Sequence, residues 1–205
     1  MEILFFILIL VFSIIIHEIS HGAVANYLGD PTAKYAGRLT LNPLKHLDPI
    51  GSLFLPILLI LTTGRGIGWA KPVPINPYNF RDQKYGALKV AIAGPISNLA
   101  IALFFGLLLR ILIYFNFTIP GIYSIFSFIV SINILLAVFN LIPVPPLDGS
   151  HVLFTFLPAS MRGIKIFLGQ FGFIILTFLI FFFPPFFYIL TYIVDIIFKL
   201  IVGAF

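Results

Sequence analysis

Two histidines and a glutamate lie within five consecutive residues, His17-Glu18-Ile19-Ser20-His21. On an α-helix, residues i and i+4 lie on one face, so both imidazoles can reach one metal ion. Glu18 follows the first histidine, where its carboxylate can accept a proton from a metal-bound water. Two imidazoles and one further protein ligand leave the fourth tetrahedral position of a zinc ion for that water. The spacing therefore predicts hydrolytic metal chemistry.

The surroundings of this motif strengthen that prediction. A five-residue motif of this kind also occurs by chance in soluble helices, but residues 3–16 are an almost unbroken apolar run and helix-compatible sequence continues to about Leu28. Ionisable groups at membrane depth cost several kcal/mol and are functional by default. Two histidines and a glutamate in such a helix are hard to explain as satisfied core groups, so a metal site is the better interpretation.

A third protein ligand is needed, and Asp148 has the most suggestive setting. It follows an uncharged 22-residue apolar stretch, residues 121–142, and prolines stand at positions 143, 145 and 146. Proline lacks an N–H and clashes with the preceding helical turn, so the helix must break there. Non-helical backbone at membrane depth is tolerated only where it lines a cavity or is packed in protein. A turn in a surface loop is the alternative for Asp148, and the other candidates are His151, Asp48, His46, Asp30 and Asp195.

The composition excludes several classes of protein. Of the 205 residues, 60% are hydrophobic and 9% are charged, with 12 Lys and Arg against 7 Asp and Glu. So few charges cannot cover a soluble globule, and such high hydrophobicity excludes disorder. The basic residues are sparse and interleaved with proline and apolar residues, so the net charge of +5 is not the footprint of a nucleic-acid partner. The absence of cysteine excludes disulfides and thiolate metal sites.

The apolar segments predict an all-α polytopic membrane protein. The first helix and residues 86–115, 121–142, 166–183 and 185–202 are long enough to span a bilayer. Residues 50–63 are shorter and contain Pro56, which favours a re-entrant segment over a crossing. We therefore expect one membrane domain over residues 1–205, with a catalytic core of about 1–157. A C-terminal helical hairpin of about 166–203 would be broken at Pro184-Pro185.

The charges of the loops predict the orientation. Lys and Arg number three in residues 29–49, five in 64–89, none in 116–120 and two in 158–165. If residues 50–63 enter and leave on one side, all three basic regions share that side. Because cytoplasmic loops carry an excess of Lys and Arg, the N-terminus is expected outside the cell membrane and the C-terminus in the cytosol. The predicted site then lies towards the cytosolic side.

Three motifs in this order resemble the site-2 protease family of intramembrane zinc metalloproteases. They are the motif from His17 to His21, the sequence Gly94-Pro95-Ile96-Ser97-Asn98, and the pattern Asn-x-x-Pro-x-x-Pro-Leu-Asp-Gly that runs from Asn140 to Gly149. The resemblance covers about residues 10 to 155. Residues 38–49 and 68–80 resemble the extended segments of the compact branch that lacks PDZ and CBS domains.

The resemblance implies a fold, a cofactor and roles for individual residues. It implies one Zn²⁺ per chain held by His17, His21 and Asp148, with Glu18 as the catalytic base. It also implies that Asn140 and the turn ending at Pro146 help to hold the substrate backbone, and that short extended or β segments beside the site pair with that backbone. The implied substrates are membrane proteins with a transmembrane segment, cleaved within the lipid bilayer, and a regulatory membrane partner is left open.

Several roles stay open at this point. Asn98 either joins two helices by hydrogen bonds, or it orients a metal ligand or stabilises an oxyanion. Asn140 either braces the unwound turn or binds substrate. We expect a structural or supporting role for His151, local hydrogen bonding for His46 and Asp48, and an ion pair between Asp195 and Lys199. Two rival functions are a divalent-metal transporter, which would be expected to carry polar ligands across the bilayer, and a non-catalytic membrane binding protein.

Overall fold

The computed structural model describes residues 2–48, 51, 54, 61, 70–117 and 119–203. Its elements are α1 (Glu2–Tyr27), α2 (Thr32–Tyr35), the 3-10 helices η1 (Pro43–Lys45) and η3 (Pro77–Asn79), α4 (Gly86–Tyr114), α5 (Ile122–Asn140), α6 (Gly149–Phe156), η4 (Ala159–Met161), α7 (Arg162–Phe182) and α8 (Pro184–Val202). The re-entrant segment predicted at residues 50–63 lies almost entirely outside the described residues.

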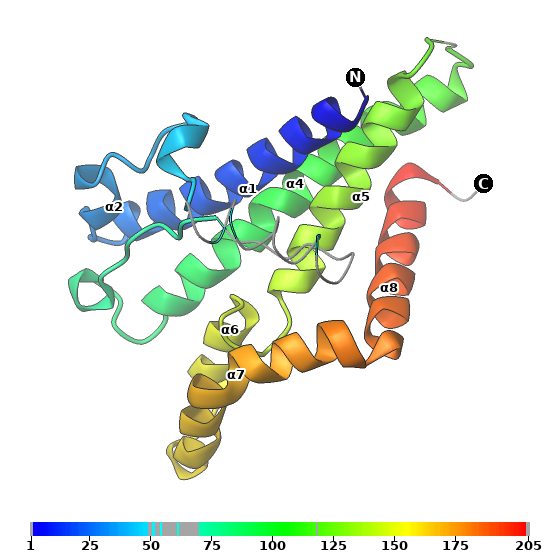
Figure 1. Ribbon diagram of the computed structural model, residues 1–205. Coiled ribbons are helices and arrows are strands. Elements are labelled where there is room, and N and C mark those ends of the chain that lie inside the picture. The colour runs from blue at the N-terminus through cyan, green and yellow to red at the C-terminus, as the bar shows by residue number, and fades with distance from the viewer. Residues whose placement is uncertain are drawn as a thin grey trace.

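The described residues include five helical segments long and apolar enough to cross a membrane (Figure 1). They are Ile3–Tyr27, Gly86–Tyr114, Ile122–Asn140, Ala159–Phe182 and Pro184–Val202. All of them except Ile122–Asn140 carry exposed large apolar side chains, as helices facing lipid do. The predicted all-α polytopic membrane protein is thereby confirmed.

Helices α1, α4 and α5 pack side by side, and α8 packs against α4 and α5. The centre of this packing is a cluster of fully buried residues where α4, α5 and α8 meet. Its members are Ala102, Leu109, Val130, Ile134 and Val202. Lipid tails are as apolar as leucine, so the hydrophobic effect does not drive helices together within a membrane. Close van der Waals packing takes its place, and small residues such as Ala102 allow it. This bundle is the scaffold on which α1 presents its polar residues.

The C-terminal pair of helices breaks where the prolines predict, at Phe183 between α7 and α8. Figure 1 shows that the two helices leave the break in different directions, so they form an open angle instead of the expected hairpin. The reason is that they pack on different neighbours. Helix α8 contacts α4 and α5, whereas α7 continues from η4.

The two segments expected to be extended form no β-strand within the part of the chain that is described. Each contains a short 3-10 helix, η1 or η3, and residues 70–76 have irregular backbone. Pro72 and Pro74 lack the N–H groups that a strand ladder requires. The N–H groups of Val73 and Asn76 donate to the carboxylates of Glu18 and Asp30. They are therefore not free to pair with a neighbouring strand. Residues 70–76 are therefore non-helical without forming a β-strand, and their expected pairing with a substrate backbone stays a prediction.

Asp30 ties this segment to the end of α1. Its carboxylate is fully buried and accepts hydrogen bonds from the Asn76 N–H (2.7 Å), the Asn79 side chain (2.9 Å), and the hydroxyl and N–H of Thr32. Burial alone would raise the pKa of the Asp30 carboxyl, but these hydrogen bonds hold the pKa below its ordinary value. Asp30, one of the alternative metal ligands, is thus occupied as a structural anchor.

We predict that Asp30→Asn destabilises the protein by about 2 kcal/mol at pH 7, because one side-chain nitrogen then faces a buried donor. The pKa of Asp30 is lower in the folded than in the unfolded state. Its stabilisation is therefore present above the unfolded pKa of about 4 and is lost as the pH falls through the folded pKa.

Thermal unfolding of the detergent-solubilised protein at pH 7 and pH 4 measures this effect. The gap between Asp30→Asn and wild type should narrow at the lower pH. Asp195→Asn, which alters only an exposed ion pair, serves as the control. A gap that is equally wide at both values would contradict the anchoring role.

Candidate metal centre

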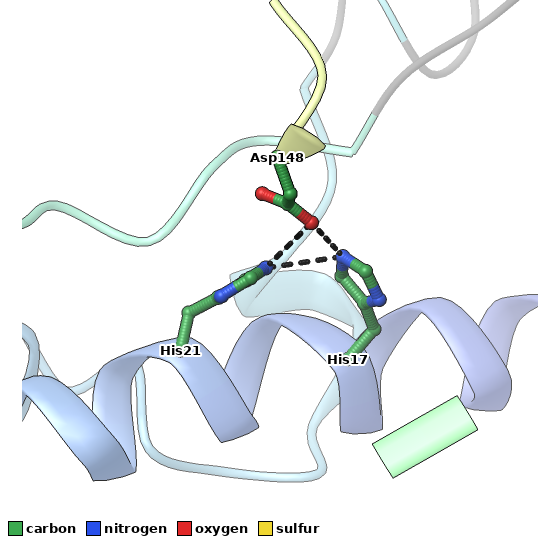
Figure 2. A group of neighbouring side chains, drawn as sticks. All are labelled: His17, His21 and Asp148. Atoms are coloured by element: carbon green, nitrogen blue, oxygen red, sulfur yellow. Dashed lines mark hydrogen bonds and ion pairs between the residues drawn. The ribbon is translucent and has the colours of Figure 1, made fainter. Parts of the chain in front are cut away.

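Two imidazoles and one carboxylate point toward one another (Figure 2). His17 Nε2 and His21 Nε2 lie 3.1 Å apart, and Asp148 Oδ2 lies 3.1 Å from the first and 3.3 Å from the second. Both histidines are buried on α1, while Asp148 comes from the turn before α6. Among the described residues this is the one group of three His, Cys, Asp or Glu side chains that could hold a metal ion.

The other ring nitrogen of each histidine is held by α4. His17 Nδ1 lies 2.6 Å from Asn98 Oδ1, and His21 Nδ1 lies 2.7 Å from the carbonyl oxygen of Val90. Both partners are oxygen acceptors, so each Nδ1 carries the hydrogen and donates it. The Nε2 atom of each neutral imidazole then carries a lone pair, which points toward the other imidazole and Asp148.

Three acceptor atoms, the two Nε2 atoms and Asp148 Oδ2, therefore face one another. A cation among them would satisfy all three. Asp148 Oδ2 is buried with no hydrogen-bond donor. A single proton could bridge one pair of these atoms, but it would leave the third atom without a partner. Ligand atoms 2.0–2.1 Å from a tetrahedral zinc are about 3.3–3.4 Å apart. The observed separations of 3.1–3.3 Å and the nitrogen and oxygen donors fit such an ion.

Gly94 of α4 lies directly against both imidazoles. A Cβ atom at this position would lie 2.5 Å from His21 Nε2 and 2.6 Å from His17 Nε2. Val90, Gly94 and Asn98 are spaced i, i+4 and i+8, so they form one stripe of α4 that faces the histidine pair of α1. The absence of a side chain at Gly94 makes the space in which the three acceptors meet.

Asp148 reaches this space because the chain unwinds after α5. Helix α5 ends at Asn140, the prolines prevent its continuation, and the Pro145–Pro146 peptide bond is cis. The loop folds back so closely that a Cβ on Gly149 would collide with the Leu141 carbonyl oxygen. Glycine is therefore required at the start of α6, directly after the carboxylate.

A cleft of about 760 Å³ opens beside the three acceptors, and Glu18 lines it. The Val73 N–H donates to Glu18 Oε2 over 3.0 Å, which holds the carboxylate at the cleft. The walls come from α1, residues 70–80, α4, the end of α5, the turn before α6, the start of α6, and Phe173 of α7. Apart from the polar groups near the three acceptors, this lining is predominantly apolar.

The remaining sequence candidates have different positions. Asn140, Pro146 and His151 line the cleft, but the Asn140 amide nitrogen donates to the Leu136 carbonyl of its own helix. Asn98 is fully buried and is not part of the cleft wall. His46 bonds locally to the Thr40 carbonyl, the Asp48 carboxylate accepts from the Gly51 N–H, and Asp195 pairs with Lys199 at 2.6 Å. Local bonding for His46 and Asp48 and the ion pair of Asp195 are therefore confirmed.

Sequence reasoning missed four groups near the centre: the Val73 N–H, the Val90 carbonyl and the side chains of Ser13 and Asn133. The two backbone groups carry no sequence signal. Ser13 and Asn133 do carry one, because each is a polar residue within an apolar span.

The sequence model of Peptidase family M50 matches residues 116–183, which include Asp148. "Putative zinc metalloprotease YwhC" of Bacillus subtilis is 38% identical over 190 residues, which are 88% of this chain and 81% of that protein. The chain belongs to Peptidase family M50, the site-2 protease family. "Putative zinc metalloprotease Rip2" of Mycolicibacterium smegmatis is 32% identical over 170 residues, covering 82% of this chain and 63% of that protein. No solved structure matches the chain.

Membership in family M50 makes the chain a metalloprotease, and the names of its relatives support zinc as the metal. The resemblance drawn from the three motifs is confirmed. A metal transporter and a non-catalytic binding protein find no support in these comparisons.

We predict that Gly94→Ala weakens zinc binding at least tenfold, because the added methyl group enters the space between the imidazoles. Metal analysis of the purified protein after equilibration with a competing chelator measures the loss. Gly169→Ala on α7 is the matched control, since a Cβ there meets nothing within 4 Å. Equal zinc contents in the two variants would show that α4 does not border the metal.

Proposed function

We propose that this metalloprotease cleaves peptide bonds in or near the transmembrane segments of membrane proteins, as in regulated intramembrane proteolysis. In this proposal one Zn²⁺ per chain is held by His17, His21 and Asp148, and Glu18 is the catalytic base. The observation that carries it is the convergence of two imidazoles and a carboxylate to 3.1–3.3 Å, beside a cleft built from membrane-spanning helices.

The chemistry divides between the metal and Glu18. When bound, zinc lowers the pKa of a coordinated water to about 7 and polarises a carbonyl group. Glu18 accepts the proton of the attacking water, whose oxygen bonds to the scissile carbonyl carbon. Glu18 then passes that proton to the nitrogen of the leaving amine as the C–N bond breaks. The hydrogen bond from the Val73 N–H keeps the carboxylate oriented for both transfers.

A transmembrane substrate must unwind before it can be cut. Peptide bonds of a membrane helix are hydrogen-bonded and shielded, and in lipid a broken bond costs several kcal/mol unless it is replaced. Residues 70–76 line the cleft in non-helical conformation and provide backbone carbonyls that can pair with an unwound segment. Asn140 and Pro146 also line the cleft, where they can hold the same segment.

The orientation in the membrane follows from the loops. Basic residues gather in the loops at the end of the bundle where α1 ends and α4 begins, and the turn between α4 and α5 has none. We propose that this basic end faces the cytosol. The cleft would then receive water and release product on the cytosolic side of the cell membrane.

We predict that Glu18→Gln retains zinc and lowers the cleavage rate by about 10²–10⁴-fold, the range that general acid–base catalysis supplies. The test is purified enzyme in lipid vesicles with a single-span membrane substrate, followed by mass spectrometry of the fragments. Asp148→Ala should lose both zinc and cleavage. Cleavage by Glu18→Gln at the wild-type rate would refute the role of Glu18. Wild-type cuts that fall only far from the transmembrane segment would refute the substrate class.

The absence of native cysteine makes the orientation directly testable. We predict that a cysteine introduced at Lys84 is shielded from a membrane-impermeant maleimide in intact cells, whereas one at Asn116 is labelled. Both positions are exposed, at opposite ends of α4. The reverse labelling pattern would invert the proposed orientation.

A further inference from the structure

Three polar side chains are buried together where α1, α4 and α5 meet: Ser13, Asn98 and Asn133. Asn98 and Asn133 are completely inaccessible to solvent. The Asn98 amide nitrogen donates to Asn133 Oδ1 over 2.8 Å and to the Ser13 carbonyl over 3.3 Å. The Asn133 amide nitrogen donates to Ser13 Oγ over 2.9 Å and to the Ile129 carbonyl over 2.8 Å.

These bonds determine which way the Asn98 amide faces. The nitrogen of Asn133 is committed to Ser13 Oγ and Ile129, so its oxygen is the atom that meets Asn98. An oxygen can only accept, and the Asn98 nitrogen must therefore lie on that side. The Asn98 oxygen is left facing His17 Nδ1 at 2.6 Å.

The direction of Asn98 decides the state of His17. With the oxygen towards Nδ1, the imidazole carries its hydrogen there and its Nε2 lone pair faces Asp148. If the amide were reversed, a donor would face Nδ1, the hydrogen would move to Nε2, and the lone pair would be lost from the metal side. The amide and its support thus act on the ligand without touching the metal.

We propose that Ser13, Asn133 and Asn98 form a relay of positioning residues that holds His17 in its Nδ1–H tautomer and keeps it ready to bind the metal. This inference rests on the proposed zinc site. None of the three side chains lines the cleft, so the relay works through His17 and not through substrate.

His21 shows why the relay serves His17 in particular. Its Nδ1 donates to the backbone carbonyl of Val90, which is always an acceptor and cannot reverse. The partner of His17 is a side-chain amide whose two ends have opposite hydrogen-bonding character. A fixed orientation is therefore needed at Asn98 alone. Polar residues that only joined the helices would also stabilise the bundle, but they would have no effect on the tautomer of His17.

The test uses the full-length protein in detergent micelles and three variants. Asn133→Leu keeps the approximate shape but removes the Oδ1 acceptor at 2.8 Å. The Asn98 amide nitrogen then keeps only the longer bond to the Ser13 carbonyl at 3.3 Å, so the amide can reverse. Ser13→Ala removes only the hydroxyl, and Asn133→Asp retains an acceptor towards Asn98. Val130→Ala is the matched control, because Val130 is a fully buried residue of the same helix that belongs to the apolar cluster.

Zinc affinity measured against a competing chelator is the first readout. Groups that support a metal ligand typically contribute 10–100-fold to affinity. We expect about tenfold weaker binding for Asn133→Leu, a loss of about two- to threefold for Ser13→Ala, and a smaller loss for Asn133→Asp than for Asn133→Leu. Val130→Ala should lower thermal stability and leave zinc affinity unchanged.

The second readout needs no metal. The chain has four histidines, so ¹⁵N spectra of histidine-labelled, metal-free protein remain simple, and His17→Ala identifies the His17 signals. Wild type should show His17 protonated at Nδ1, and Asn133→Leu should show a substantial fraction protonated at Nε2. Zinc affinity within twofold of wild type in Asn133→Leu, with an unchanged His17 spectrum, would overturn the relay.

The variants also separate this inference from the proposed function. If His17→Ala and Asp148→Ala lose zinc while Asn133→Leu retains it, the relay alone is wrong. If His17→Ala and Asp148→Ala retain wild-type zinc affinity, the proposed metal site itself is wrong and the relay has no ligand to position. Should Asn133→Leu fail to fold, Ser13→Ala and Asn133→Asp carry the same comparison.

Discussion

The arrangement of this molecule depends on three acceptors that have to share a small space. The Nε2 atoms of His17 and His21 and the Oδ2 atom of Asp148 lie 3.1–3.3 Å from one another in a largely apolar surrounding. Like-charged or lone-pair atoms repel at this distance unless a cation lies among them, and low dielectric makes the repulsion stronger. The three atoms therefore fit a metal ion, and the surrounding structure supplies the constraint that keeps them together.

For the two histidines, that constraint comes from helix α4, which acts on them in two ways. Helix α4 orients both imidazoles through Asn98 and the Val90 carbonyl, and at Gly94 it leaves the space into which they point. Residues 70–80, anchored by Asp30, complete the cleft and hold Glu18. A metalloprotease of family M50 thus has its polar machinery inside a bundle whose outer surface remains apolar.

Most of this arrangement could be predicted from the sequence because its signals are local. The His17 and His21 spacing, the apolar spans and the prolines before Asp148 each dictate a conformation within a few residues. The open angle between α7 and α8 and the hydrogen bonds of Val73 and Val90 could not be predicted, because they depend on which helices pack together. Asn133 and Ser13 carried a polar signal, but their pairing with Asn98 appears only when three helices are brought into contact.

The most direct measurement of the central claim is X-ray absorption at the zinc edge of the purified, zinc-loaded protein. The account predicts a four-coordinate ion with two imidazoles, one carboxylate and one further oxygen at about 2.0–2.1 Å. The chain has four histidines, so other imidazole counts are possible and would be visible. A shell with three or four imidazoles, or six oxygen atoms and no imidazole, would contradict a site formed by His17, His21 and Asp148.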